Sequence, residues 1–312
     1  MKNLSRLSLL LFLCISFFAK AQEHQGPPPL EGRWDLTIDM NGKQLPAWLE
    51  MKHTGIQKNL IGRVMIIGGS ARPVSKVVVD GPKFSFAIPP QWEKSDNDVQ
   101  IEGSLMGEKI EGTIKNWDGK IYKWTGERAP SLKREKDPEW SAPVALFDGK
   151  DMSKWHTVGA NQWIVEDGIL KNPKSGSNLL SNDKYTDFKL HIEFKYPKGS
   201  NSGVYLRGRY EVQVADSKDK EPWEDELGGV YGLLAPNENA AKNPGEWQSY
   251  DITLIGRRVT IVLNGKTVIS DQVIAGITGG AMDSKEGEPG PFMIQGDHGA
   301  VEYRNIVVTP SK

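Results

Sequence analysis

The chain has 312 residues, of which 25% are charged, with 33 glycines, 19 prolines and a formal net charge of -1. A nearly neutral chain without a long block of like charges lacks the basic surface of nucleic-acid-binding proteins, so no nucleic-acid partner is expected. At roughly 100–200 residues per domain, the length predicts two domains. The high content of glycine and proline favours a turn-rich, all-β fold.

The N-terminus has the three parts of a secretory signal peptide. Lys2 and Arg6 precede an apolar run over residues 7–18, and an Ala-Lys-Ala cleavage site ends at Ala21. The run is shorter than the ~20 residues that a membrane helix needs, so no membrane span is expected after the signal peptide, residues 1–21, is removed. The mature protein is therefore predicted to be secreted or periplasmic.

Cysteine usage and motif absences limit the chemistry that the chain can perform. The only cysteine, Cys14, lies in the predicted signal peptide, so the mature chain has no disulfide, thiolate metal site or cysteine nucleophile. The acidic loop over residues 216–226 lacks the spacing of an EF-hand, and zinc-protease and phosphate-loop motifs are absent. Neither a metal nor another cofactor is predicted, and no protein partner.

Residues 22–29 are a polar, proline-rich lead-in, and residues 30–128 predict a small accessory domain, either a β-barrel or a β-sandwich. Asn41-Gly42 is a hairpin turn, because both residues tolerate a positive φ. An apolar-x-Gly-x-apolar pattern, typical of strands that cross where a side chain does not fit, recurs around Gly62, Gly103 and Gly112.

The accessory domain opens with Gly32-Arg33-Trp34, which is weakly similar to the opening of lipocalin-like barrels. Its tryptophans Trp48 and Trp92 could contact carbohydrate, but packing in the core or at the rim is the favoured interpretation.

Residues 129–143 are charged and interrupted by prolines, which predicts a linker. Residues 144–310 then read as a series of short strands without a clear helix, and Asn264-Gly265 predicts a type I′ hairpin between two of them. This pattern favours a sandwich of two antiparallel sheets.

The clearest alternation in the chain runs over residues 189–215, where apolar and polar residues take turns. If consecutive strands pair, polar residues from three strands share one sheet face. These residues are Glu193, Tyr205, Arg207, Glu211 and Gln213. Such a mixture of carboxylates, guanidinium, amide and phenol suits a polyhydroxylated ligand, and an ordinary solvated face is the alternative.

The second domain also carries short motifs in a fixed order. The motifs are Leu146-Phe147-Asp148-Gly149-Lys150, Trp163-Ile164-Val165-Glu166-Asp167-Gly168, Asn201-Ser202-Gly203-Val204-Tyr205-Leu206-Arg207-Gly208, Tyr210-Glu211-Val212-Gln213-Val214, Tyr231-Gly232 and Gln295-Gly296-Asp297-His298-Gly299. In this order they resemble the 3-keto-disaccharide hydrolase domain family, over residues 144–310. The resemblance implies a concanavalin A-like jelly-roll sandwich and cleavage of glycosides whose sugar is oxidised to a 3-ketone. Gly296 is an insertion relative to the common Gln-Asp-His-Gly ending of the family.

The implied reaction begins with removal of the acidic C2 proton, continues with loss of the C1 oxygen and ends with addition of water. It needs a base, an acid and a donor to the enolate oxygen. His298 is the first candidate for acid or base, Glu211 the second, and Arg207 the candidate oxyanion partner. The remaining candidates, for binding the oligosaccharide or glycoside substrate, are Asn201, Tyr205, Gln213, Glu193, Trp223, Tyr231, Gln295 and Asp297.

Two other functions use the same sheet face. An ordinary glycoside hydrolase needs two carboxylates, for which Glu193 and Glu211 are candidates, although the E-x-D-x-x-E signature of sandwich glucanases is absent. A non-catalytic carbohydrate-binding module would use the face without needing His298. A His298 that points toward the ligand face favours the enzyme.

Overall fold

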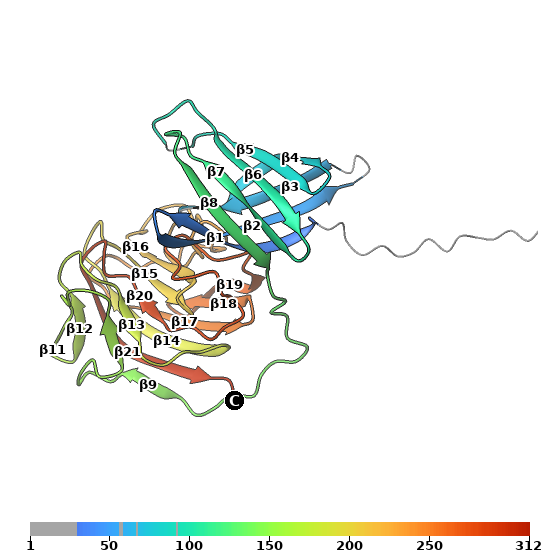
Figure 1. Cartoon of the computed structure of the whole chain (residues 1–312). Coiled ribbons are helices and arrows are strands. Elements are labelled where there is room, and N and C mark those ends of the chain that lie inside the picture. The colour runs from blue at the N-terminus through green and yellow to red at the C-terminus, as the bar shows by residue number, and fades with distance from the viewer. Residues whose placement is uncertain (1–29, 56–58, 67, 92) are drawn as a thin grey trace, which may run out of the picture.

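The computed structural model describes residues 30–55, 59–66, 68–91 and 93–312. The predicted signal peptide, the lead-in and Trp92 lie outside the described residues. The described part contains strands and no helix, and therefore no helix that could cross a membrane. The chain forms a barrel and, against it, a sandwich of two sheets (Figure 1). The predicted all-β fold is thus confirmed, and the accessory domain is a barrel.

The barrel closes because its last strand pairs antiparallel with its first. Its strands are β1 (Gly32–Met40), β2 (Lys43–Thr54), β3 (Asn59–Met65), β4 (Arg72–Asp80), β5 (Lys83–Ile88), β6 (Val99–Met106), β7 (Lys109–Lys115) and β8 (Ile121–Arg128). Alternate side chains point inward, and Trp34, Phe84 and Trp124 help to fill the interior. A Cβ on Gly103 would lie 2.5 Å from the ring of Phe84, which explains the glycine in this strand.

The sandwich packs a five-stranded sheet against an eight-stranded sheet, with one apolar core between them. The five-stranded sheet consists, in spatial order, of β10 (Trp155–Thr157), β13 (Leu179–Ser181), β20 (Met293–Ile294), β15 (Asn201–Leu206) and β16 (Tyr210–Ala215). The eight-stranded sheet consists of β11 (Ile164–Glu166), β12 (Ile169–Asn172), β21 (Val301–Pro310), β14 (Phe188–Lys195), β17 (Gln248–Ile255), β18 (Arg258–Leu263) and β19 (Lys266–Val273), with β9 (Val144–Phe147) paired to β21.

Alternation along the strands fills this core. Ile192 and Phe194 of β14 face Val204 and Val212 across the two sheets, and all four side chains are buried. The neighbouring residue at each alternate position therefore points to the outer face of its own sheet. Asn264-Gly265 joins β18 and β19 with φ values of 52° and 82°, as the predicted type I′ turn requires.

The barrel and the sandwich share part of one core. Trp48 of β2 and Met65 of β3 belong to the apolar cluster of the sandwich, and Trp48 is fully buried. The favoured interpretation of Trp48 as a packing residue is therefore correct. The segment between the two parts is also held against the sandwich, because Leu132 is buried and Arg134 pairs with Asp187 at 2.7 Å.

Candidate functional site

A row of residues crosses the outer face of the five-stranded sheet. In the strand register, His156 lies opposite Leu180, Leu180 opposite Met293, Met293 opposite Tyr205, and Tyr205 opposite Glu211. Leu180, Met293 and Tyr205 form a small apolar cluster separate from the main core. The row thus combines an apolar surface, formed by this cluster, with the neighbouring carboxyl group of Glu211. Such a surface is suited to one face of a sugar ring.

Glu211 is the carboxyl group of this row, and its pKa is shifted toward neutrality. Its residue is only 5% exposed, and burial raises the pKa of its carboxyl group to about 7, with a smaller contribution in the same direction from the charge of Asp297. The hydrogen bond with Tyr205 works in the opposite direction. A carboxyl group that exchanges its proton near neutral pH is suited to general acid–base chemistry.

The hydrogen bonds around Tyr205 allow Glu211 to hold a proton. The Tyr205 hydroxyl lies 2.7 Å from Glu211 Oε2 and 2.9 Å from the carbonyl oxygen of Gly279. One hydroxyl proton serves one acceptor at a time. When Glu211 is protonated it donates to Tyr205, which then donates to Gly279. When Glu211 is charged, Tyr205 donates to Glu211 instead.

Glycines make room for this pair. A Cβ on Gly203 would lie 2.4 Å from Glu211 Oε1, so the carboxyl group lies over a position without a side chain. A Cβ on Gly280 would lie 2.4 Å from the Tyr205 hydroxyl. The Glu211 backbone N–H donates to Thr278 Oγ1 at 2.9 Å. Both the carboxyl group and the strand that carries it are therefore positioned by close contacts.

Gln295 and Gln213 flank Gly203 on the same face. Gln213 lies opposite Gly203 in the register, and the Gln295 N–H donates to the Gly203 carbonyl at 2.9 Å. Gln213 Oε1 accepts the N–H of Val214 at 3.0 Å. Gln295 Oε1 is buried and has no hydrogen-bond partner among the described residues. Gln295 therefore keeps a free acceptor beside Glu211.

Asp297 and His298 follow β20 in a loop that borders the same site. Asp297 Oδ1 lies 2.7 Å from His298 Nδ1, and both side chains are about half exposed, at 49% and 48%. The charge of Asp297 acts on both Glu211 and Tyr205. The bond to Asp297 leaves His298 Nε2 as the nitrogen available to a ligand.

Three further predicted residues lie on the elements next to the site. Tyr231 is half-buried, and burial, followed by the charge of Glu211, raises its pKa. Asn201 is exposed at the start of β15, on the face that also carries Gly203 and Tyr205. Trp223 is 62% exposed in the loop before Tyr231.

The structure corrects the placement of Glu193. It lies on β14 of the other sheet, where its carboxylate accepts hydrogen bonds from Arg304 Nε at 2.6 Å and Asn305 Nδ2 at 2.7 Å. Since Glu193 and Glu211 both point away from the shared core, they lie on opposite outer faces of the sandwich. The two cannot serve as a carboxylate pair for ordinary glycoside hydrolysis.

The structure also corrects the placement of Arg207. This residue follows the end of β15, where the alternation stops, and its φ is +55°. Its buried guanidinium group donates to Tyr210 Oη at 3.0 Å and to the carbonyls of Gly256 and Glu286 at 2.9 and 3.2 Å. Its two terminal nitrogens, Nη1 and Nη2, are bound to protein groups, and its buried Nε has no hydrogen-bond partner among the described residues. Because the whole guanidinium group is enclosed by the protein, Arg207 is not an oxyanion donor here.

Sequence reasoning missed Thr278, Gly279 and Gly280. They come from the long connection between β19 and β20, residues 274–292, whose glycine-rich composition reads as a simple surface loop. The Gly279-Gly280 pair was a local signal for a close backbone approach. No group of three or more histidine, cysteine or acidic side chains suited to a metal ion occurs among the residues described.

Comparison with known family models gives a match that lies in the sandwich. A model of the 3-keto-alpha-glucoside-1,2-lyase-like domain matches residues 142–309. A Bacteroides thetaiotaomicron protein named 3-keto-disaccharide hydrolase is 32% identical over 113 residues, which cover 32% of this chain and 37% of that protein. The chain thus matches little more than a third of the length of this curated relative.

Two crystal structures of proposed glycosyl hydrolases from Parabacteroides distasonis are each similar to about half of the chain. The first has a TM-score of 0.47 and 31% identity over 53% of this chain and 82% of that one. The second has a TM-score of 0.46 and 20% identity over 55% of this chain and 94% of that one.

Proposed function

Because the chain belongs to the 3-keto-alpha-glucoside-1,2-lyase-like domain family, we propose that its sandwich cleaves the glycosidic bond of sugars that carry a ketone at C3. The observation that carries this proposal is the buried Glu211 carboxyl group, with a pKa of about 7, on a sheet face shared with Tyr205 and Gln295. A base of this strength is matched to the removal of a proton made acidic by a neighbouring ketone.

In the proposed reaction, Glu211 takes the proton from C2 and the electron pair forms an enolate with the C3 oxygen. The enolate expels the C1 oxygen, which receives a proton from His298 as the C1–O bond breaks. Water then adds to C1 of the resulting enone and C2 regains a proton. The net change is hydrolysis, and Glu211 and His298 return to their starting protonation states.

The other side chains are proposed to hold the sugar. Tyr231 replaces Arg207 as the candidate donor to the enolate oxygen, because it borders Glu211 and keeps its proton at neutral pH. Gln295, whose buried Oε1 has no partner among the described residues, accepts a sugar hydroxyl once its amide group turns toward the sugar. Met293 and Leu180 form the apolar floor under the ring.

The test is product analysis with paired 3-keto and unoxidised glucosides. We expect release of the aglycone only from the keto form. Glu211→Gln should lower kcat by at least about 100-fold, as should His298→Ala, because each removes a proton-transfer group. Glu193→Gln, on the opposite face, is the matched control and should retain activity. Equal release from both glucosides would contradict the elimination reaction, and glycan binding without turnover would identify a carbohydrate-binding module.

The pH dependence tests which proton transfer Glu211 performs. As a base, Glu211 acts in its charged form, so the rising limb of the kcat/KM profile should have its midpoint at about pH 7. A falling limb should follow at higher pH, where the acid His298 loses its proton, and should be absent in His298→Ala. The titratable groups that interact electrostatically with Glu211 are Tyr205, Tyr231, Tyr303 and Asp297, and the pKa of each of these tyrosines is raised. A His298→Ala profile in which kcat/KM falls through pH 7 would instead assign Glu211 as the acid.

A further inference from the structure

The barrel lies outside the residues that match the family, and yet it contacts the connection that completes the Glu211 site. This connection, residues 274–292, leaves β19 and reaches β20. Thr278 and Gly279 in its middle bind the Glu211 backbone and the Tyr205 hydroxyl. The position of this connection therefore decides which acceptor the Tyr205 proton can reach.

The first hairpin of the barrel, β1 and β2, binds the connection on both sides of Thr278 and Gly279. Trp48 Nε1 donates to the carbonyl of Ile277 at 2.8 Å. The Trp48 ring also packs against Gly276, where an added Cβ would lie 2.4 Å from it. Because Trp48 is fully buried in the sandwich core, its hydrogen bond is shielded from water and the ring cannot shift without opening a cavity.

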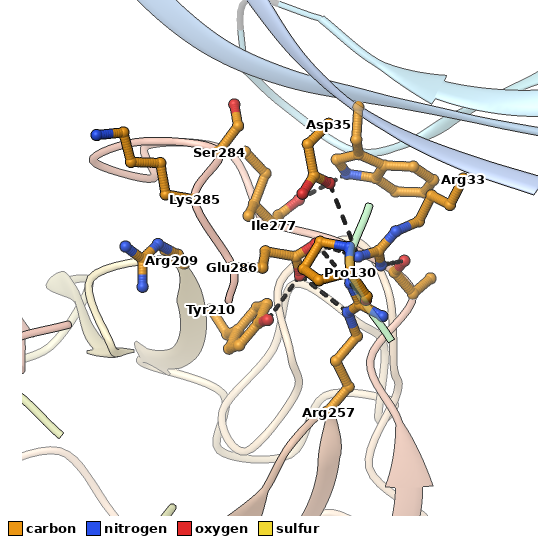
Figure 2. Close-up of polar contacts among 12 residues, drawn as sticks. Arg33, Asp35, Pro130, Arg209, Tyr210, Arg257, Ile277, Ser284, Lys285 and Glu286 are labelled. Carbon is orange, nitrogen blue, oxygen red and sulfur yellow. Dashed lines mark hydrogen bonds and ion pairs between the residues drawn. The ribbon is translucent and has the colours of Figure 1, made fainter. Parts of the chain in front are cut away.

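The same hairpin anchors the far end of the connection. Ser284 Oγ donates to the carbonyl of Leu36 at 2.5 Å. Arg33 binds the Ala275 carbonyl and the Glu286 carboxylate, and Figure 2 shows Arg33, Ser284 and Glu286 where the barrel meets the connection. Glu286 is fully buried and also accepts from Tyr210 Oη at 2.6 Å. Two anchors, one before and one after Gly279, restrict the connection between them.

A second barrel element lies at the border of the site. In the loop between β3 and β4, the Gly69 backbone approaches Gly279 so closely that an added Cβ on Gly279 would lie 2.8 Å from it. A Cβ added to Gly232, the residue after Tyr231, would lie 2.5 Å from Ser70 Oγ. The barrel thus contacts both segments that flank Glu211.

We propose that the barrel is a structural part of the catalytic site and that Trp48 is a positioning residue, which holds Gly279 where it accepts the proton of Tyr205. This proposal rests on the proposed function of Glu211. It assigns the barrel a task other than that of an independent carbohydrate-binding module. Without the Trp48 contact, Gly279 withdraws, and Tyr205 donates to Glu211 alone, which favours the charged form of Glu211.

Trp48→Phe is the test variant, because it removes the Nε1–H donor and keeps an aromatic ring. Trp124→Phe is the matched control, since Trp124 is a buried barrel residue whose Nε1 has no hydrogen-bond partner in the described part of the chain. We expect Trp48→Phe to lower kcat about 10-fold with little change in KM, and to shift the kcat/KM midpoint to lower pH. Trp124→Phe should leave kcat, KM and the pH midpoint of kcat/KM unchanged.

Hydrogen exchange provides a readout that does not depend on turnover. Amides of residues 276–282 should exchange at least about 10-fold faster in Trp48→Phe than in the wild type, while Trp124→Phe leaves them unchanged. The proposal would be overturned if these amides exchanged in Trp48→Phe at the wild-type rate and the pH midpoint of kcat/KM were unchanged. A failure of the proposed function is distinguishable from a failure of this proposal. In that case the wild type itself would not turn over the 3-keto glucoside. The exchange rates of residues 276–282 would still show whether Trp48 positions the connection.

Discussion

At the scale of single residues, the site depends on one proton shared among three groups. Tyr205 stands between Glu211 and the Gly279 carbonyl, at 2.7 and 2.9 Å. Desolvation favours the uncharged form of Glu211, and the Tyr205 hydrogen bond favours the charged form. The balance brings the pKa to about 7, so small changes of geometry alter the charge of Glu211 at neutral pH.

Gly203→Ala tests this geometry. The new methyl group would lie 2.4 Å from Glu211 Oε1 and must displace the carboxyl group. We expect kcat/KM to fall at least about 10-fold, because a misplaced proton-transfer group loses most of its effect. The control is Gly55→Ala, where the added Cβ has nothing within 4 Å. Wild-type kinetics in Gly203→Ala would show that the position of Glu211 is not critical.

At the scale of elements, the hairpin of β15 and β16 separates functional from structural side chains. Tyr205 and Glu211 point outward, while Val204 and Val212 point into the core. Arg207 lies past the last paired residue of β15, so the alternation does not govern it. It turns into the protein and binds Tyr210, Gly256 and Glu286. Arg207, a polar residue just after a strand, therefore stabilises the fold and does not contact the ligand face.

Arg207→Ala should therefore act on stability. The change leaves the Tyr210 hydroxyl and two buried carbonyls without their donor, which costs about 2–4 kcal/mol of unfolding free energy. Denaturant unfolding measures the difference. Arg304→Ala, which removes a 38% exposed guanidinium group from its ion pair with Glu193, is the control and should cost about 0–1 kcal/mol. Similar losses for both variants would contradict the structural assignment of Arg207.

At the scale of the whole molecule, charged side chains are buried where the barrel meets the sandwich. The Glu286 carboxylate binds Arg33 of the barrel and Arg257 of the sandwich, and Asp35 lies beside them (Figure 2). Burial, followed by the charge of Glu286, raises the pKa of Asp35 to about 8. Asp35 and Glu286 also line a cavity of about 860 Å³ between the two parts. The interface thus includes a carboxyl group that keeps its proton up to mildly alkaline pH.

Asp35→Asn should stabilise the protein at alkaline pH. Between pH 3.8, the ordinary pKa, and about 8, the folded state retains a proton that the unfolded chain releases. A rise in pH over this window therefore lowers the unfolding free energy, by up to about 1.4 kcal/mol per pH unit. Asparagine removes this loss, so Tm should exceed that of the wild type at pH 8 and equal it at pH 4. Exposed Asp80→Asn is the control, and a variant that is less stable at pH 8 would contradict the argument.

Much of the fold was predictable because it depends on local properties of the sequence. Alternation identified the strands, and the Asn-Gly pairs identified turns that need a positive φ. The family of the sandwich was also predictable from its motifs, as the match over residues 142–309 confirms. The secretory signal in residues 1–21 stays a prediction.

The composition of the site depended on the tertiary structure. Alternation says that Glu193 and Glu211 point away from the core, but only the pairing of strands decides that they belong to different sheets. Arg207 lies beyond the end of its strand, so the alternation does not predict the direction of its side chain. The contact of Trp48 with Ile277 joins residues more than 200 positions apart. Sequence alone determined the elements and the family, while the folding of distant segments onto one another decided which side chains share the site, because packing and hydrogen bonding across sheets have no local signal.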